Sequence, residues 1–121
     1  LKRKVSSTAT LFPIGTSTTS YNPVTLTNTG TIDSFTVSVR STFTNPLSNP
    51  SRAVNKQWSV AADNANGSNL TTLLGWVTAD QGSNFVPTAS LILARHNGTA
   101  YQHCLSHFPI QQALQILETL L

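Results

Sequence analysis

Apolar residues recur at every second position in several stretches of this chain, the period of a strand with one face on a core. The clearest stretches are residues 34–43, 54–60 and 70–76. Their inward positions define a predicted core of Phe35, Val37, Val39, Trp58, Val60, Leu74 and Trp76. The pattern therefore predicts three half-buried strands, with both tryptophans inside and close to each other.

Shorter stretches of the same kind lie on either side. Residues 5–14 alternate loosely, and residues 24–27 lie between two clusters of turn-forming residues. Residues 89–101 contain Asn97-Gly98, the strongest short-range signal for a hairpin. Because turn signals separate the stretches and no helical pattern comes between them, the sequence predicts an all-β antiparallel sandwich of immunoglobulin-like architecture.

The C-terminal segment, residues 104–121, fits two patterns. One helical face would carry Ile110, Ala113, Leu114, Leu117 and Leu121. An alternating strand would carry Ile110, Gln112, Leu114 and Ile116. We favour a short C-terminal helix, because Ala, Leu, Gln and Glu are good helix formers and Pro109 suits the first turn.

A chain of 121 residues is long enough for one domain with its own core. We interpret residues 1–9 as an N-terminal arm whose Lys2-Arg3-Lys4 cluster is solvated. No aromatic stacking platform or second basic stripe accompanies this cluster, which argues against a nucleic-acid partner. No apolar run approaches the roughly 18 residues of a membrane helix, so we expect no membrane span.

The composition favours a location outside the cell. Only 9% of the residues are charged, and Ser, Thr and Asn are abundant, as is typical of extracellular β proteins. The single cysteine excludes an intrachain disulfide. Methionine is absent even at position 1, which predicts a processed or excerpted product that has lost any export signal.

An ordered set of short motifs resembles a known repeat. The motifs are Phe12-Pro13-Ile14-Gly15-Thr16, Tyr21-Asn22-Pro23-Val24-Thr25-Leu26, Val54-Asn55-Lys56-Gln57-Trp58, Leu74-Gly75-Trp76 and Arg95-His96-Asn97-Gly98. Together they resemble a β-sandwich repeat of large surface and secreted proteins of the Bacteroidota that use the type IX export route. The resemblance covers about residues 10–102 and implies an extracellular, non-catalytic module.

The chain departs from this family in two places. Members usually carry Arg-Thr at the position of Lys56-Gln57, and they usually end in a strand rich in Ser, Phe and Gly at the position of 104–121. No export tail of that system is recognisable in the sequence. The resemblance carries over no catalytic residues.

One cluster suggests a metal site, because imidazole and thiolate are good zinc ligands. It consists of His96, His103, Cys104 and His107. Its spacing matches no established pattern, and adjacent residues on a strand face opposite sides, so His103 and Cys104 could not easily share one ion. We predict no bound metal. Cys104 lacks a recognisable base or oxyanion site and is not expected to act as a nucleophile.

The carboxylates give no catalytic pattern either. They are Asp33, Asp63, Asp80 and Glu118, and we interpret the three aspartates as solvated turn residues. Neither the facing pair of a glycosidase nor a calcium-binding loop is recognisable. We therefore expect no enzyme activity and no cofactor.

The predicted function is a non-catalytic structural or adhesive module at a bacterial cell surface. Its expected partners are further copies of itself, neighbouring domains of the same protein, or a cell-surface polysaccharide. Strand addition at the chain ends could build a filament, for which the candidate contact residues are Val5, Leu11, Leu114, Leu117 and Leu121. A carbohydrate-binding module using exposed Tyr21 and Tyr101 is the alternative, and a small hydrolase or metalloprotein is the least favoured.

Overall fold

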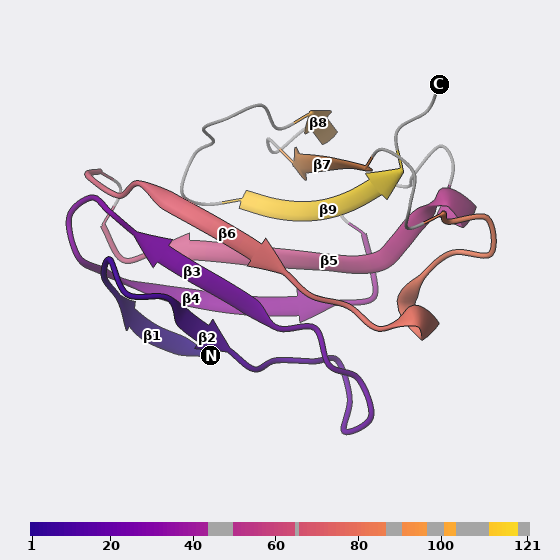
Figure 1. Cartoon of the computed structure of the whole chain (residues 1–121), viewed down its shortest axis with the longest axis horizontal. Helices are drawn as coiled ribbons and strands as arrows, with labels where there is room; N and C mark the ends of the chain where they lie inside the picture. The colour runs from indigo at the N-terminus through magenta and orange to yellow at the C-terminus, as the bar shows by residue number, and fades with distance from the viewer. Residues whose placement is uncertain (44–49, 65, 87–90, 97–100, 104–111, 119–121) are drawn as a thin grey trace.

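The computed structural model describes residues 1–43, 50–64, 66–86, 91–96, 101–103 and 112–118, the last three ranges as backbone strands. Within these ranges the chain is all-β, apart from two one-turn 3₁₀ helices, η1 (Pro50–Arg52) and η2 (Thr78–Asp80). The strands form two antiparallel sheets (Figure 1). The all-β antiparallel prediction is thus confirmed, while the immunoglobulin-like sandwich type stays a prediction.

The larger sheet has six strands in the described part of the chain. Their spatial order is β1 (Lys2–Val5), β4 (Asp33–Arg40), β5 (Ala53–Ala62), β9 (Gln112–Glu118), β7 (Leu91–His96) and β8 (Tyr101–His103). The smaller sheet has the order β2 (Thr10–Phe12), β3 (Val24–Asn28) and β6 (Leu70–Leu74). In Figure 1, β3 and β6 cross in front of β4 and β5, so the sheets form two layers.

The apolar core draws on both sheets. Register pairs Val37 with Val60 and Val39 with Trp58, which brings the inward faces of β4 and β5 together. The fully buried residues of the cluster include Val5, Phe12, Val24, Leu26, Phe35, Val37, Val54 and Trp58. Alternation along each strand places these side chains on one face because successive side chains of a strand point to opposite sides.

The predicted core residues are all found in this cluster or against it. Phe35, Val37, Trp58 and Val60 are buried within it. Val39, Leu74 and Trp76 are partly buried and pack against it. The ring of Trp76 meets Phe85 edge to face, with centroids 6.2 Å apart. Phe85 was absent from the predicted core because it lies outside the alternating stretches.

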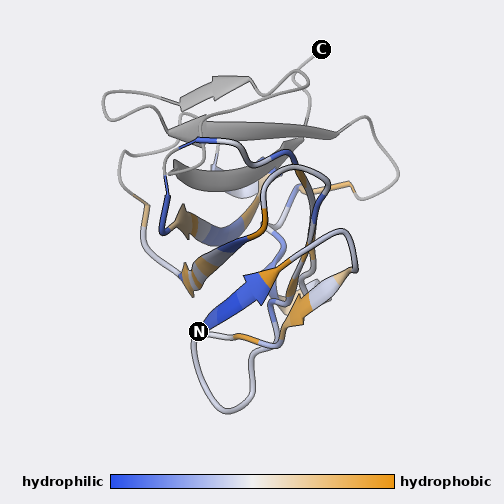
Figure 2. Ribbon diagram, turned by 90° about the vertical axis from the view of Figure 1, so that its left-hand side faces the viewer, coloured by the Kyte–Doolittle hydropathy of each residue, from blue (hydrophilic) through white to orange (hydrophobic). Residues whose placement is uncertain are grey.

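Part of the N-terminal arm expected for residues 1–9 is instead the strand β1. Lys2–Val5 pairs with β4, and the Leu1 amino group donates a hydrogen bond to the Val37 carbonyl at 3.0 Å. The cationic residues of this strand are exposed, and Figure 2 colours the strand blue, as hydrophilic, beside the N-terminus. Val5 is fully buried in the chain's own core, so the prediction that it serves an assembly contact is wrong.

The expected C-terminal helix is also wrong. Residues Gln112–Glu118 form β9, which lies between β5 and β7 and pairs with both. The register places Leu114 opposite Trp58 and Leu117 opposite Ala53, so these two assembly candidates belong to a strand of the chain's own sheet. Hydrogen-bond partners on both sides outweigh helix propensity, which is a weak preference. Leu121 lies outside the described residues.

The two strands of the hairpin predicted around Asn97-Gly98 are confirmed. β7 and β8 pair antiparallel, with His96 opposite Tyr101. The Asn97-Gly98 turn that motivated the prediction lies outside the described residues, as does most of the proline-rich connection at 45–50.

Replacing Trp58 with Ala should lower the free energy of unfolding by about 3–5 kcal/mol, because it removes the largest buried side chain of the core. Urea titration followed by circular dichroism measures this change. The matched control is Leu73→Ala, which alters an exposed side chain and should change stability by less than about 0.5 kcal/mol. Equal effects of the two substitutions would contradict the core assignment.

Candidate functional site

A buried polar cluster lies between the two sheets. It consists of Asn22, Lys56 and Asp80, whose residues are no more than 7% exposed. Lys56 belongs to β5 of the larger sheet, Asn22 precedes β3 of the smaller sheet, and Asp80 ends η2. Three separate parts of the chain therefore bring a cation, an anion and a carboxamide to one place.

The carboxylate of Asp80 holds this cluster together. Its Oδ2 accepts a hydrogen bond from Asn22 Nδ2 at 2.6 Å and another from the Val77 backbone N–H at 3.2 Å. Its Oδ1 lies 3.5 Å from Lys56 Nζ. The two carboxylate oxygens therefore face different partners, the amine on one side and the carboxamide on the other.

Lys56 has two further partners. Its Nζ donates hydrogen bonds to Thr16 Oγ1 at 3.0 Å and to Ser41 Oγ at 2.8 Å. An ammonium group has three hydrogens, so the two hydroxyls and Asp80 account for all of them. A buried ion pair offsets its desolvation cost only when its remaining donors and acceptors are also satisfied, as they are here.

The backbone around Asn22 is fixed on both sides. Its N–H donates to the Ile14 carbonyl at 2.7 Å, and its carbonyl accepts from Trp58 Nε1 at 3.2 Å. Pro23 restricts the preceding residue to extended conformations, which suits this pair of contacts. Gly75 lies so close to Pro23 that an added Cβ would be 2.7 Å from the proline ring. The position of Asn22 is thus set by packing as well as by hydrogen bonds.

The sequence patterns did not predict this cluster. Lys56 shares the inward parity of Trp58 and Val60, and that parity was the available signal that a lysine would be buried. The interpretation of Asp80 as a solvated turn residue is wrong, because the residue is buried. Asn22 and Asp80 are 58 positions apart, so no local pattern in the sequence indicates their contact.

Asp33 also differs from its predicted role. It begins β4, is buried, and accepts 2.8 Å hydrogen bonds from the backbone N–H of Ser34 and from both the backbone and side-chain amides of Asn64. The Asn64 backbone N–H is the main cause that lowers the pKa of Asp33 below its usual 3.8, and burial acts in the opposite direction. Asp63 is the solvated residue that we predicted, paired at the surface with Lys2 at 2.7 Å.

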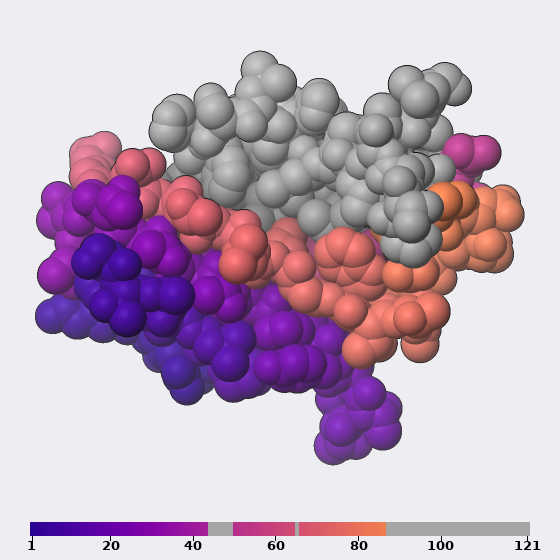
Figure 3. Space-filling model, in the orientation of Figure 1, coloured from indigo at the N-terminus to yellow at the C-terminus, as the bar shows by residue number. Residues whose placement is uncertain are grey.

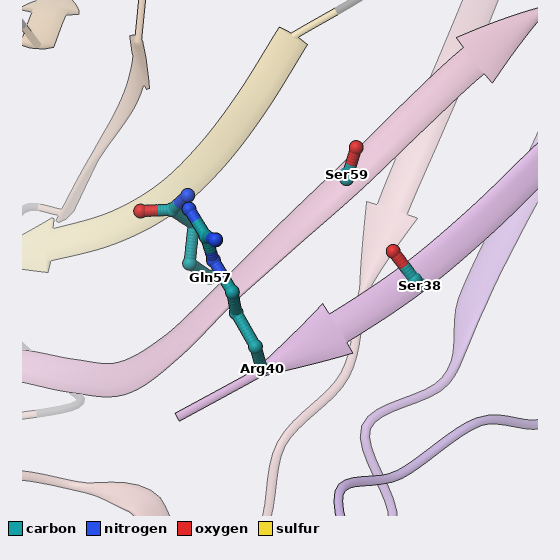
Figure 4. A pocket seen from close by; sticks show the side chains of 4 residues that line it. All are labelled: Ser38, Arg40, Gln57 and Ser59. Atoms are coloured by element: carbon teal, nitrogen blue, oxygen red, sulfur yellow. The ribbon is translucent and has the colours of Figure 1, made fainter. Parts of the chain in front are cut away.

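A polar depression of about 240 Å³ lies on the outward face of the larger sheet. Ser38 and Arg40 of β4 and Gln57 and Ser59 of β5 line it (Figure 4). These residues are cross-strand neighbours, Ser38 opposite Ser59 and Arg40 opposite Gln57. In Figure 4 the Arg40 side chain extends toward that of Gln57. The depression is thus lined by the exposed hydroxyl and guanidinium groups of Ser38, Ser59 and Arg40 and by the buried Gln57.

The outward face of the smaller sheet is apolar by contrast. Leu11 of β2 lies opposite Thr25 of β3, and Thr25 lies opposite Leu73 of β6. The two leucines are 43% and 65% exposed. This leucine row, formed by Leu11, Thr25 and Leu73, belongs to the sheet that faces the viewer in Figure 3. Leu11 is thus the one assembly candidate that the structure describes as exposed.

The candidate metal ligands are only partly described. His96 lies in β7 and His103 in β8, whereas Cys104 and His107 are outside the described residues. Among the residues that are described, no three His, Cys, Asp or Glu side chains gather in a way that could hold a metal. Neither 3₁₀ turn of the described chain has the length and apolar character needed to cross a membrane.

No protein-family model, curated protein or solved structure matches the chain. The resemblance to the Bacteroidota repeat therefore stays a prediction.

Replacing Asp33 with Asn should destabilise the protein at neutral pH but make little difference in acid. A group whose pKa is lowered by folding contributes stability above its unfolded value, here 3.8, and this contribution disappears as the pH falls through the folded-state pKa. Urea midpoints of the two proteins should therefore converge as the pH is lowered below 3.8.

Asp63→Asn is the control for this experiment, because it removes only an exposed ion pair, expected to contribute about 0–1 kcal/mol. A constant difference between wild type and Asp33→Asn across the pH range would contradict the proposed role of the Asp33 charge.

Proposed function

We propose that this chain is a non-catalytic structural or adhesive module of an extracellular bacterial surface protein. The observation that carries the proposal is the leucine row on the outward face of the smaller sheet. In this row Leu11 and Leu73 are exposed on one outward face with Thr25 between them, and we take the row as the apolar contact surface of the module. The low charge content and abundance of hydroxyl and amide side chains support the extracellular assignment.

The strand edges favour one route of self-association. β1 ends the larger sheet with the exposed residues Lys2, Arg3 and Lys4, and charges on an edge strand oppose pairing with another chain. β6 ends the smaller sheet and carries no charged residue over Leu70–Leu74. β2, the other edge of the smaller sheet, is also uncharged but has only three residues, so strand addition is favoured at β6, which carries Leu73 of the leucine row. Repetition of such a contact from copy to copy would build a filament.

We expect Leu73→Ser to weaken self-association by about tenfold or more, because it removes the most exposed leucine of the row. Thr71→Lys, which places a charge on the edge strand β6, should weaken strand addition by a similar factor. Sedimentation velocity across a concentration series measures both effects.

The matched control is Ile32→Ser. Ile32 is 53% exposed but lies outside the leucine row, so its replacement should leave association unchanged. A wild-type protein that remains monomeric at the highest concentration, or a control variant that weakens association as much as Leu73→Ser, would contradict this use of the surface.

A carbohydrate-binding module is the second candidate, and the polar depression favours it. Its Ser, Gln and Arg side chains supply the donors and acceptors that a sugar requires for orientation. Tyr21 is exposed, as an aromatic platform would need to be, but it does not line the depression.

Arg40→Ala should abolish saccharide binding measured by calorimetry against bacterial surface polysaccharides, because it removes the guanidinium of the depression. Arg3→Ala, on the exposed strand β1, is the control and should bind as wild type does. Absence of heat from wild-type protein with every polysaccharide would exclude this second candidate.

A further inference from the structure

The buried cluster of Asn22, Lys56 and Asp80 contains the three groups required to make a covalent cross-link. Lys56 supplies an amine as nucleophile, Asn22 a carboxamide as electrophile, and Asp80 a carboxyl group that can carry a proton. All three residues are at least nine-tenths buried. We propose that Lys56 and Asn22 form an isopeptide bond between the two sheets, with Asp80 as proton carrier.

The positions of the atoms match these roles. Asp80 Oδ1 lies 3.5 Å from the attacking nitrogen, Lys56 Nζ, and Asp80 Oδ2 lies 2.6 Å from the leaving nitrogen, Asn22 Nδ2. One carboxyl group therefore reaches both nitrogens between which a proton must move. The Val77 N–H, 3.2 Å from Oδ2, helps to hold the carboxyl group in this orientation.

The hydroxyl groups around Lys56 orient its ammonium group toward Asp80. Thr16 and Ser41 each accept one hydrogen from Nζ, which leaves the third directed to Asp80. Transfer of that third proton to Asp80 turns a buried ion pair into two neutral groups. The lone pair that is left on Nζ then lies on the side of Asp80, where the Asn22 carboxamide is also held.

The reaction balances without an external reagent. The neutral amine of Lys56 attacks Cγ of Asn22 and forms the new C–N bond, and the bond from Cγ to Nδ2 breaks. Asp80 returns its proton to Nδ2, which leaves as ammonia, and the second proton lost by Nζ leaves with it as ammonium. The net change converts a lysine ammonium and an asparagine carboxamide into an amide and one ammonium ion, and no group is oxidised or reduced.

The surroundings favour this reaction over hydrolysis. Burial excludes the water that would otherwise compete for the carboxamide. Hydrogen bonds from the Asn22 N–H to the Ile14 carbonyl and from Trp58 Nε1 to the Asn22 carbonyl fix the backbone that carries the carboxamide, so Lys56 Nζ is the group that has to approach. Groups held in this way react as if at very high concentration once the reacting atoms are about 3–3.5 Å apart.

Such a bond would connect β5 of the larger sheet to the residue that leads into β3 of the smaller sheet. The chain has a single cysteine, so no intrachain disulfide can make a connection of this kind. The cross-link would prevent the sheets from separating under force. This inference does not depend on the leucine row, and its failure would leave the proposed function intact.

Mass spectrometry of the intact, denatured wild-type protein tests the proposal. The expected result is a mass lower than the sequence mass by one ammonia. Trypsin should then fail to cleave after Lys56, and a branched peptide should join the Lys56 segment to residues 5–40, which contain Asn22. Lys56→Arg and Asp80→Asn should restore the unmodified mass, whereas Lys4→Arg, which changes an exposed lysine of β1, should retain the loss.

An unchanged wild-type mass would overturn the proposal, and this result does not depend on whether any variant folds. Loss of one water would also overturn it, because it would identify Asp80 rather than Asn22 as the electrophile. Loss of ammonia together with normal trypsin cleavage after Lys56 would overturn the proposal as well. Cyclisation of an asparagine at an Asn-Gly sequence such as Asn97-Gly98 also removes one ammonia, and it would then explain the change in mass.

Discussion

The contacts of the Asp80 carboxylate with Lys56 and Asn22 are the interactions on which the polar connection between the two sheets depends. The carboxylate pairs with Lys56 of the larger sheet and accepts a hydrogen bond from Asn22, next to the smaller sheet. A buried charge without its partner costs several kcal/mol, so Lys56 and Asp80 hold each other in the interior. Trp58 strengthens the same junction, because its indole N–H binds the Asn22 carbonyl while its ring lies in the core.

The two sheets share a core but present different outward faces. The larger sheet exposes hydroxyl and guanidinium groups around the depression at Arg40, which the buried Gln57 also lines, and the smaller sheet exposes the leucine row. Their edges differ as well, since β1 is cationic and β6 is uncharged. This division gives one layer a polar outward face and the other an apolar one, and the buried cluster links the two layers.

Some of this arrangement could be read from local patterns. Alternation identified β4, β5 and β6 and the inward faces that carry Phe35, Val37 and Trp58, and the turn-forming residues on either side identified β3. It could not place segments whose state depends on partners. Gln112–Glu118 favoured a helix by propensity, yet it lies between two strands that satisfy its backbone on both sides. Lys2–Val5 resembled a solvated arm, but pairing with β4 and burial of Val5 make it a strand.

By itself the sequence determined the all-β class and the part of the apolar core that lies on the clearest alternating strands, because a period of two and turn residues act over a few neighbouring positions. Only the tertiary structure decided that Lys56, Asp80 and Asn22 are buried together, that Asp33 is held by Asn64, and that β9 joins β5 to β7. The physical reason is that burial of a charge is favourable only with its partners, and these partners come from distant parts of the chain.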